Sequence, residues 1–401
     1  KQKTAYEISL GLVGSEMCIR DRYIGRTSLG FFDDETVGIF SILLFSLFFL
    51  RSIEREKPQR VNLLYAIASG LSLGYLCASW GASRYPMAMA VLFTLVMILT
   101  RRYSTRLFMS YGITFGLALF IAMNVPYLSL RFLRETSILP IYGVFLLLCA
   151  LEIYYRMRSW RAKVICIISF IVLIAAATTM LWLLGYIKPL PTKYLSVLNP
   201  FHRASYPLIE SVAEHRPSAW GTFFYDLGVG VLFIPIGLYF AIQMGTDKGI
   251  FLSIFCLTSI YFASSMVRLT LIMAPAVSLI WALAIVRLIK PFIVLLREPP
   301  LTSRRRKFRP RLGKEFVSIL LITLFILLLV TFVIGADFPR GRGAQGPRVF
   351  AQAYSPVTIA AASMPVKPSK TVTDWFEAMA WIRENLPPSP PKGPTVIASW
   401  W

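Results

Sequence analysis

The 401-residue sequence is poor in charge, in histidine and in cysteine motifs. Charged residues make up 15% of it, against about a quarter in a typical soluble domain, and 56% of it is hydrophobic. It holds two histidines, and its five cysteines show no metal-ligand spacing, which argues against a histidine-rich zinc or di-iron site and against a disulfide-stapled secreted fold. With a mean hydropathy of +0.63, this composition excludes a disordered or collagen-like chain and indicates a membrane protein.

Basic residues outnumber acidic ones by 42 to 20, which gives a formal net charge of +22. They lie in short clusters between apolar runs, which is the pattern of cytoplasmic loops in membrane proteins. We therefore attribute the charge to membrane topology. The expected partner of these loops is the lipid bilayer, and no nucleic acid is expected.

Apolar runs of about 15–25 residues predict ten membrane-spanning helices. The expected fold class is accordingly α, a polytopic membrane helix bundle. Several of the runs contain proline, which membrane helices tolerate when neighbouring groups satisfy the freed backbone. The approximate limits of the ten runs are 36–50, 61–80, 86–100, 108–130, 138–154, 164–187, 222–245, 250–266, 269–289 and 316–336.

The charge of the loops predicts how these helices are oriented. Alternate loops are rich in Lys and Arg, the last of them running from Arg287 to Lys314, and are expected to be cytoplasmic. The loops between them carry acids and belong to the opposite face. Six spans separate residues 33–35 from the long loop 188–221, and four more separate that loop from residues 337–401. All three regions are therefore predicted on the non-cytoplasmic face.

The chain divides into three regions. We interpret residues 1–22 as a non-native tail and residues 23–336 as a membrane domain with the long external loop 188–221. Residues 337–401 are expected to be a linker and the truncated start of a soluble α/β domain. In that domain the stretch TDWFEAMAWIRENL, from Thr373, predicts an amphipathic helix, and TVIASWW predicts a buried strand.

A run of acids stands directly before the first apolar run. Arg26 is followed by FFDDETVGIF, in which Asp33 and Glu35 are two positions apart. Carboxylate oxygens at this spacing suit Mg²⁺ or Mn²⁺, which prefer hard ligands. The alternative is an acidic cap on a helix N-terminus, which the helix dipole favours by about 0.3–1 kcal/mol.

Two further motifs carry ionisable residues. Glu214 and His215 stand in ESVAEHRPSAWGTFFYDLG, and the alternative to a functional role is an interfacial loop anchored by its aromatic side chains. Arg268 is an isolated charge in YFASSMVRLTL. Its forked guanidinium suits a phosphate ligand, and the alternative is an arginine that snorkels at the end of a span.

These motifs, in this order, resemble those of the catalytic subunit of oligosaccharyltransferase. SVAEHRPSAWGTFFYDL resembles the family's Ser-Val-Ser-Glu motif and its sequel, YFASSMVRL resembles the span with its phosphate-binding arginine, and TVIASWW resembles the run into Trp-Trp-Asp-Tyr-Gly. The family has a thirteen-span fold with a second acidic motif before its fourth span, so ten spans after that motif fit. The resemblance covers essentially residues 23–401.

The resemblance implies an enzyme that transfers an oligosaccharide from a dolichyl phosphate or diphosphate carrier to Asn in Asn-X-Ser/Thr. It also implies inversion at the anomeric carbon and Mn²⁺ or Mg²⁺ as cofactor. The site residues that it implies, by position, are Asp33 and Glu35 as metal ligands, Arg26 and Glu214 as catalytic residues, Arg268 as ligand of the donor phosphate, and Trp400 and Trp401 in acceptor binding.

The sequence departs from the family pattern at both ends. The first acidic motif would precede the sequence and the Asp of the acceptor motif would follow Trp401, so the fragment itself is expected to be inactive. Ser-Val-Ala-Glu, in place of Ser-Val-Ser-Glu, favours an archaeal plasma membrane over the endoplasmic reticulum, with partner subunits only in a eukaryotic protein. The alternatives are another membrane glycosyltransferase with a lipid-phosphate sugar donor and, less favoured, a multi-span transporter.

Overall fold

The computed structural model describes residues 34–183, 227–297, 314–334 and 373–385, and isolated residues between 184 and 226. Every regular element in these ranges is a helix. The chain forms two units, Lys1–Tyr354 and Ser355–Trp401. In the second, the predicted amphipathic helix is present as α19 (Thr373–Asn385), whereas the strand predicted in TVIASWW lies outside the described residues.

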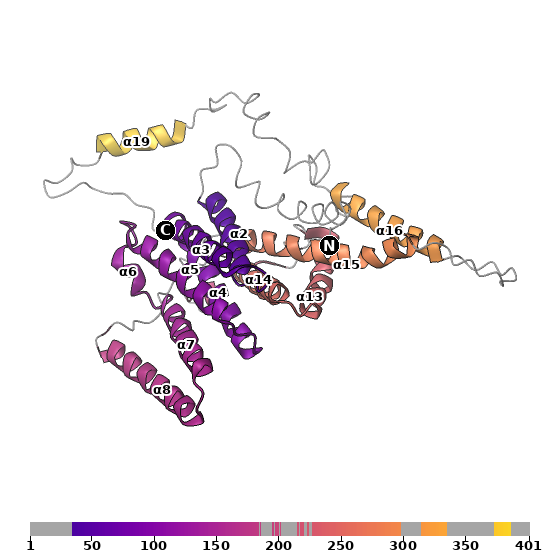
Figure 1. The fold of residues 1–401 in the computed structure, drawn as a ribbon. Coiled ribbons are helices and arrows are strands. Elements are labelled where there is room, and N and C mark those ends of the chain that lie inside the picture. Colours follow the sequence, from indigo (N-terminus) through magenta and orange to yellow (C-terminus); the bar gives the residue numbers. More distant parts are fainter. Residues whose placement is uncertain are drawn as a thin grey trace. The chain divides into compact units, whose positions relative to one another are not determined.

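The first unit is a bundle of apolar helices (Figure 1). In its first half α3 packs against both α2 and α5, and in its second half α13, α14 and α15 pack together. The helices are α2 (Glu35–Ser52), α3 (Gln59–Ser79), α4 (Arg84–Leu99), α5 (Thr105–Met123), α6 (Ser129–Leu133), α7 (Leu139–Arg156), α8 (Trp160–Leu183), α13 (Phe233–Gln243), α14 (Asp247–Ser265), α15 (Thr270–Arg297) and α16 (Lys314–Ile334), with short 3₁₀ turns η2 (Gly81–Ser83), η4 (Gly228–Leu232) and η5 (Val267–Leu269).

Aromatic contacts join the two halves of the bundle. Phe49 of α2 meets Phe93 of α4 edge-on at 6.2 Å between ring centroids, and Phe93 meets Phe251 of α14 at 5.3 Å. All three rings are buried in one continuous apolar core. Edge-to-face pairs of this kind add about 0.5–1.5 kcal/mol to the burial of the rings, so α4 fixes α14 beside α2.

Eight helices in the described ranges are long and apolar enough to cross a membrane. The other two predicted spans are present as apolar helices, of which α13 has 11 residues and α16 has 21. The run 222–245 contains η4 and α13, and the run 316–336 corresponds to α16, whose described apolar stretch is Phe316–Leu327. On α8 many large apolar side chains are exposed, as a hydrocarbon environment requires; they include Ile165, Ile168, Ile171, Val172, Leu173 and Met180.

A contact across the bundle identifies the run 222–245 as a crossing as well. Seven of the eight candidate spans lie between Glu35, at the start of α2, and Arg268, just after α14. An odd number of crossings would put these residues at opposite ends of the bundle, yet their side chains are 3.1 Å apart. The five-residue η4 and the 11-residue α13 together rise about 26 Å, close to the hydrocarbon thickness of about 30 Å. An eighth crossing between Leu183 and Asp247 brings the two residues to one end.

Candidate functional site

The candidate site is centred on an ion pair between Glu35 and Arg268. The Nε of Arg268 donates a hydrogen bond to Oε1 of Glu35 at 3.1 Å. The Glu35 side chain is 1% exposed, and that of Arg268 is 41% exposed. The pair therefore has a buried anionic side and an accessible cationic side, and an anion reaching it from solvent meets the guanidinium first.

Local structure explains both positions. Glu35 is the first residue of α2, where a carboxylate is favoured by the partial positive charge of the helix N-terminus. Arg268 lies in η5, between α14 and α15. The backbone breaks there because Met266 is extended, with φ −150° and ψ 127°. The break turns the chain at the end of the bundle and presents the arginine beside the start of α2.

Short described parts of the loop 188–221 contact the last turns of α14. Ser218 donates its backbone N–H to the carbonyl of Ser264 at 3.1 Å and its hydroxyl to the carbonyl of Ala263 at 2.6 Å. On the earlier side of the loop, Ser265 donates to the carbonyl of Val197 at 2.9 Å. Tyr261 donates to the carbonyl of Leu198. Both sides of the loop are thus held at the end of α14 that leads to Arg268.

A largely apolar cavity of about 480 Å³ adjoins this contact. It is lined by residues of the loop end, of η4 and of the three packed helices, among them Ser218, Phe223, Leu227, Pro235, Ile260 and Met273. The cavity lies against the residues that hold the loop. It widens the accessible space beside the end of α14.

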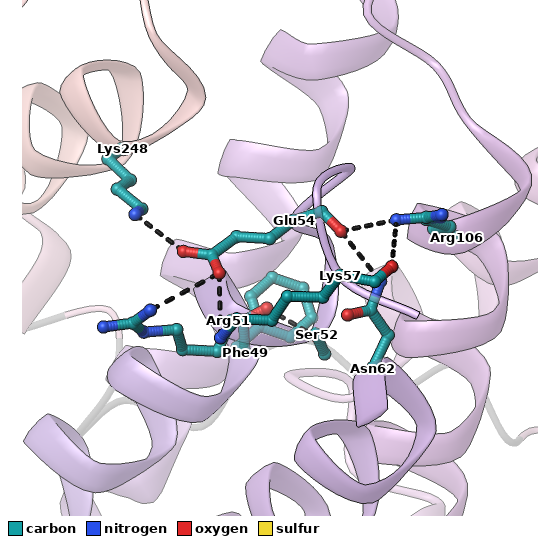
Figure 2. A network of polar contacts seen from close by, with 8 residues as sticks. All are labelled: Phe49, Arg51, Ser52, Glu54, Lys57, Asn62, Arg106 and Lys248. Carbon is teal, nitrogen blue, oxygen red and sulfur yellow. Dashed lines mark hydrogen bonds and ion pairs between the residues drawn. The ribbon is translucent and has the colours of Figure 1, made fainter. Parts of the chain in front are cut away.

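A second polar network lies at the opposite end of α2 (Figure 2). Glu54 accepts ion pairs from Lys248 at 2.6 Å, from Lys57 at 2.9 Å and from Arg51 at 3.5 Å. Arg106 donates to the main-chain carbonyls of Glu54 and Lys57. Burial raises the pKa of Glu54, but the hydrogen bonds and charges of Lys248, Lys57 and Arg51 outweigh it and hold the pKa at about 2. The carboxylate therefore stays ionised, and it ties α2 to the start of α14.

Of the predicted site residues, the structure describes Glu35 and Arg268 and brings them into contact. His215, the neighbour of Glu214, is also described. The other predicted site residues lie outside the described residues, and their roles stay predictions; they are Arg26, Asp33, Glu214, Trp400 and Trp401.

The described residues at this end suit a hard cation in chemistry but do not complete a site. Glu35 offers carboxylate oxygens, the ligands that Mg²⁺ and Mn²⁺ prefer. Within the part of the chain that the structure describes, no group of three or more His, Cys, Asp or Glu side chains is close enough to hold a metal ion. The carboxylate fits a metal-binding role only together with residues outside the described ranges, such as Asp33.

Sequence reasoning did not single out Ser218, Glu54 or Lys248. Ser218 acts through carbonyl groups of a distant helix, which leaves no pattern in the sequence. The sequence gives only a weak indication that Glu54 pairs with Lys248. Each residue stands beside an apolar run, where we attributed the charge of the loops to membrane topology.

Comparison with known proteins gives consistent matches. Residues 11–281 match the family described as Oligosaccharyl transferase STT3, N-terminal. The chain is 28% identical over 418 residues to the dolichyl-diphosphooligosaccharide–protein glycosyltransferase subunit STT3B of Oryza sativa subsp. japonica, covering 99% of this chain and 56% of the relative. It is 28% identical to subunit STT3 of Dictyostelium discoideum, covering 100% of this chain and 54% of the relative. The chain thus spans about half the length of these curated relatives.

Among solved structures, the chain resembles the archaeal oligosaccharyltransferase AglB from Archaeoglobus fulgidus, solved with an inhibitory peptide and a dolichol-phosphate. The TM-score is 0.57 at 15% identity, with 96% of this chain and 46% of that chain covered. The apo form of the Archaeoglobus fulgidus enzyme gives the same TM-score. At this identity the likeness concerns the fold, and it confirms the predicted helical membrane architecture.

Proposed function

The chain belongs to the oligosaccharyl transferase STT3 family, and from this membership we propose that the complete protein transfers an oligosaccharide from a dolichyl phosphate or diphosphate carrier to Asn in Asn-X-Ser/Thr. The observation that carries the proposal is the contact between Glu35 and Arg268. One belongs to the motif predicted to bind the metal and the other to the motif predicted to bind the donor phosphate. A lipid-phosphate sugar donor needs both groups at one place.

Arg268 would bind the phosphate of the donor. Its guanidinium is permanently charged, has a planar set of donors that matches phosphate oxygens, and is accessible beside a buried carboxylate. As the bond between the anomeric carbon and the phosphate oxygen breaks, negative charge grows on the departing phosphate. A fixed cation at that point lowers the barrier because it interacts more strongly with the transition state than with the bound donor.

Asp33 and Glu35 would hold the divalent metal, Mn²⁺ or Mg²⁺. The ion would supply Lewis-acid stabilisation of the same departing phosphate. Glu35 is poised for this role because its carboxylate is buried at a helix N-terminus, where Arg268 keeps it oriented.

Glu214 would engage the amide of the acceptor asparagine. An amide nitrogen is a poor nucleophile because its lone pair is delocalised, and a carboxylate that accepts hydrogen bonds from the amide weakens that delocalisation. The nitrogen would attack the anomeric carbon as the bond to the phosphate oxygen breaks, so the configuration inverts, and one amide proton passes to the departing phosphate or to water. Arg26 would lie at the catalytic site, and Trp400 and Trp401 would begin the acceptor-binding motif.

We place the complete protein in the endoplasmic reticulum membrane, with the site on the non-cytoplasmic face. The eukaryotic relatives at 28% identity support this membrane over the archaeal plasma membrane that the Ser-Val-Ala-Glu motif favours. In that membrane partner subunits are expected. We also propose the predicted domain division, with residues 23–336 as the membrane domain and residues 337–401 leading into a soluble domain.

The test is a transfer assay on the complete protein. Detergent-purified enzyme is given a dolichol-linked oligosaccharide and a fluorescent peptide that contains Asn-Ala-Thr, and the control peptide has Gln in place of Asn. Glycosylation should shift the peptide that contains Asn and leave the control peptide unchanged. Chelation of the metal should abolish this shift, and Mn²⁺ or Mg²⁺ should restore it. Transfer to both peptides would indicate another acceptor, and transfer to neither would remove the proposed function.

A further inference from the structure

The hydrogen bond between Ser218 and Ser264 connects two sequence motifs that each carry a predicted functional residue. The backbone N–H of Ser218 binds the carbonyl of Ser264. Glu214 lies four residues before Ser218, and Arg268 lies four residues after Ser264. Ser218 therefore closely follows the predicted acceptor-engaging residue in the sequence, and Ser264 closely precedes the predicted phosphate-binding arginine.

The junction between Ser218 and α14 forms at the C-terminal turn of that helix, where main-chain carbonyls lack donors within the helix. The helix ends at Ser265, so the carbonyls of Ala263 and Ser264 belong to the last turn, where intrahelical donors run out. Ser218 supplies donors to both of these carbonyls, one from its backbone and one from its hydroxyl, and it is half-buried in doing so. The serine hydroxyl thus acts as a cap on another segment's helix.

We propose that Ser218 is a positioning residue, which holds the end of the loop 188–221 against the last turn of α14, just before Arg268. The inference rests on the proposed function. Ser218 is not proposed to contact a substrate. Its effect on acceptor binding passes through the backbone of the loop, in which Glu214 is the predicted acceptor-engaging residue. Arg268 is held separately, by the end of α14 and by its ion pair with Glu35, so donor binding does not depend on Ser218.

Ser264→Ala provides a matched control. The Ser264 hydroxyl belongs to the same junction but donates to the carbonyl of Ile260 in its own helix, at 2.8 Å. Removing it deletes one hydroxyl at the same place without loosening the loop. Ser218→Thr keeps a hydroxyl on Cβ and tests rescue.

The experiment measures kcat and KM of the complete enzyme separately for acceptor peptide and donor. Ser218→Ala is expected to raise the acceptor KM roughly 3- to 10-fold, the effect of one hydrogen bond, with the donor KM within about twofold of wild type. Ser264→Ala and Ser218→Thr should stay within about twofold in every constant. Equal behaviour of Ser218→Ala and Ser264→Ala would overturn the proposal, as would a fall in kcat with both KM values unchanged, which indicates only less folded enzyme.

Hydrogen exchange tests the junction independently of transfer. The peptide that contains Ser218 should exchange slowly in the wild-type protein and in Ser264→Ala, and faster in Ser218→Ala. If the wild-type enzyme transfers nothing, the proposed function has failed, and protection at Ser218 still decides whether the junction exists. Fast exchange of this peptide in an active wild-type enzyme would overturn the positioning role and leave the proposed function standing.

Discussion

Glu35 and Arg268, 233 positions apart in the sequence, form an ion pair in which the carboxylate is buried and the guanidinium reaches solvent. Loop charge and span counting place both residues on one face of the membrane. The contact adds that they belong to one site. Two independent motifs, one acidic and one basic, thereby become two sides of a single place, as their proposed metal-binding and phosphate-binding roles require.

Replacement of Arg268 should nearly abolish glycan transfer. Loss of a group that stabilises developing charge costs about 3–4 kcal/mol, so Arg268→Ala in the complete protein is expected to lower kcat about 10²- to 10³-fold. Arg268→Lys keeps the charge but loses the forked geometry, and it should recover part of this loss. Activity of Arg268→Ala within threefold of wild type, in the peptide-transfer assay, would contradict the phosphate-binding role.

The ion pair between Glu35 and Arg268 should also contribute to the stability of the folded protein. Arg268→Ala withdraws the cation from a carboxylate that is 1% exposed, so it should destabilise the protein by about 1–3 kcal/mol. In the double variant Glu35→Gln/Arg268→Ala the charge is removed as well, and the loss should be smaller than the sum of the two single losses. Thermal unfolding in detergent measures this coupling. Strict additivity would show that the two side chains do not interact in the folded protein.

Glu54 should make stability depend on pH at acid values. The pKa of Glu54 is about 2 in the folded protein, below the ordinary value of 4.5. Its contribution to the free energy of unfolding is therefore present above about pH 4.5 and is lost as the pH falls toward 2. Glu54→Gln should therefore cost about 1–2 kcal/mol at pH 7. The difference from wild type should shrink below pH 4.5. Glu56→Gln, at an exposed position two residues further on, is the control and should show little change at any pH.

A close helix approach should make Gly237 intolerant of a side chain. A Cβ at Gly237 in α13 would come within 3.0 Å of the main-chain carbonyl of Ile280 in α15, and a backbone cannot move aside cheaply. Gly237→Ala is expected to lower the thermal unfolding midpoint or the folded yield. A Cβ at Gly116 in α5 meets nothing within 4 Å, so Gly116→Ala should be neutral or slightly stabilising. An equal response of the two variants would contradict the packing of α13 on α15.

The crossing assigned to η4 and α13 can be tested by labelling. Phe201 and Met244 are both exposed and lie on either side of this segment. With the native cysteines replaced, Phe201→Cys should react with an impermeant maleimide from one side of sealed membranes and Met244→Cys from the other. Reaction of both from the same side would remove the crossing and leave the contact of Glu35 with Arg268 unexplained.

The fold was predictable to the extent that it depends on apolar runs. The runs that became α2 and α14 are long and nearly free of charge, so the sequence predicts them directly. The run 222–245 was expected as an ordinary span, but its described part begins with a 3₁₀ turn where Gly230 packs on Trp281, and its α-helix is only 11 residues long. Close packing against another helix determines this 3₁₀ turn and the short helix after it, and the hydropathy of the run alone does not predict them.

The site was predictable in its membership and less so in its contacts. Glu35 and Arg268 stand out because charge beside apolar sequence is costly without a partner. Their contact depends on the aromatic packing of α2, α4 and α14, which involves residues far apart in the sequence. Ser218 gave no signal at all, since any serine can donate to a carbonyl and only the folded chain decides which.

Ion pairs at both ends of the bundle also fix the register of α2 relative to α14. Glu35 is tied to Arg268 at one end and Glu54 to Lys248 at the other, and these two helices run in opposite directions. A slip of one helical turn would shift one helix past the other by about 5.4 Å and would part both pairs together. Sliding would therefore break both ion pairs at once. A movement that opens the site has to tilt or rotate the two helices as one body, or has to begin by breaking one of the two ion pairs.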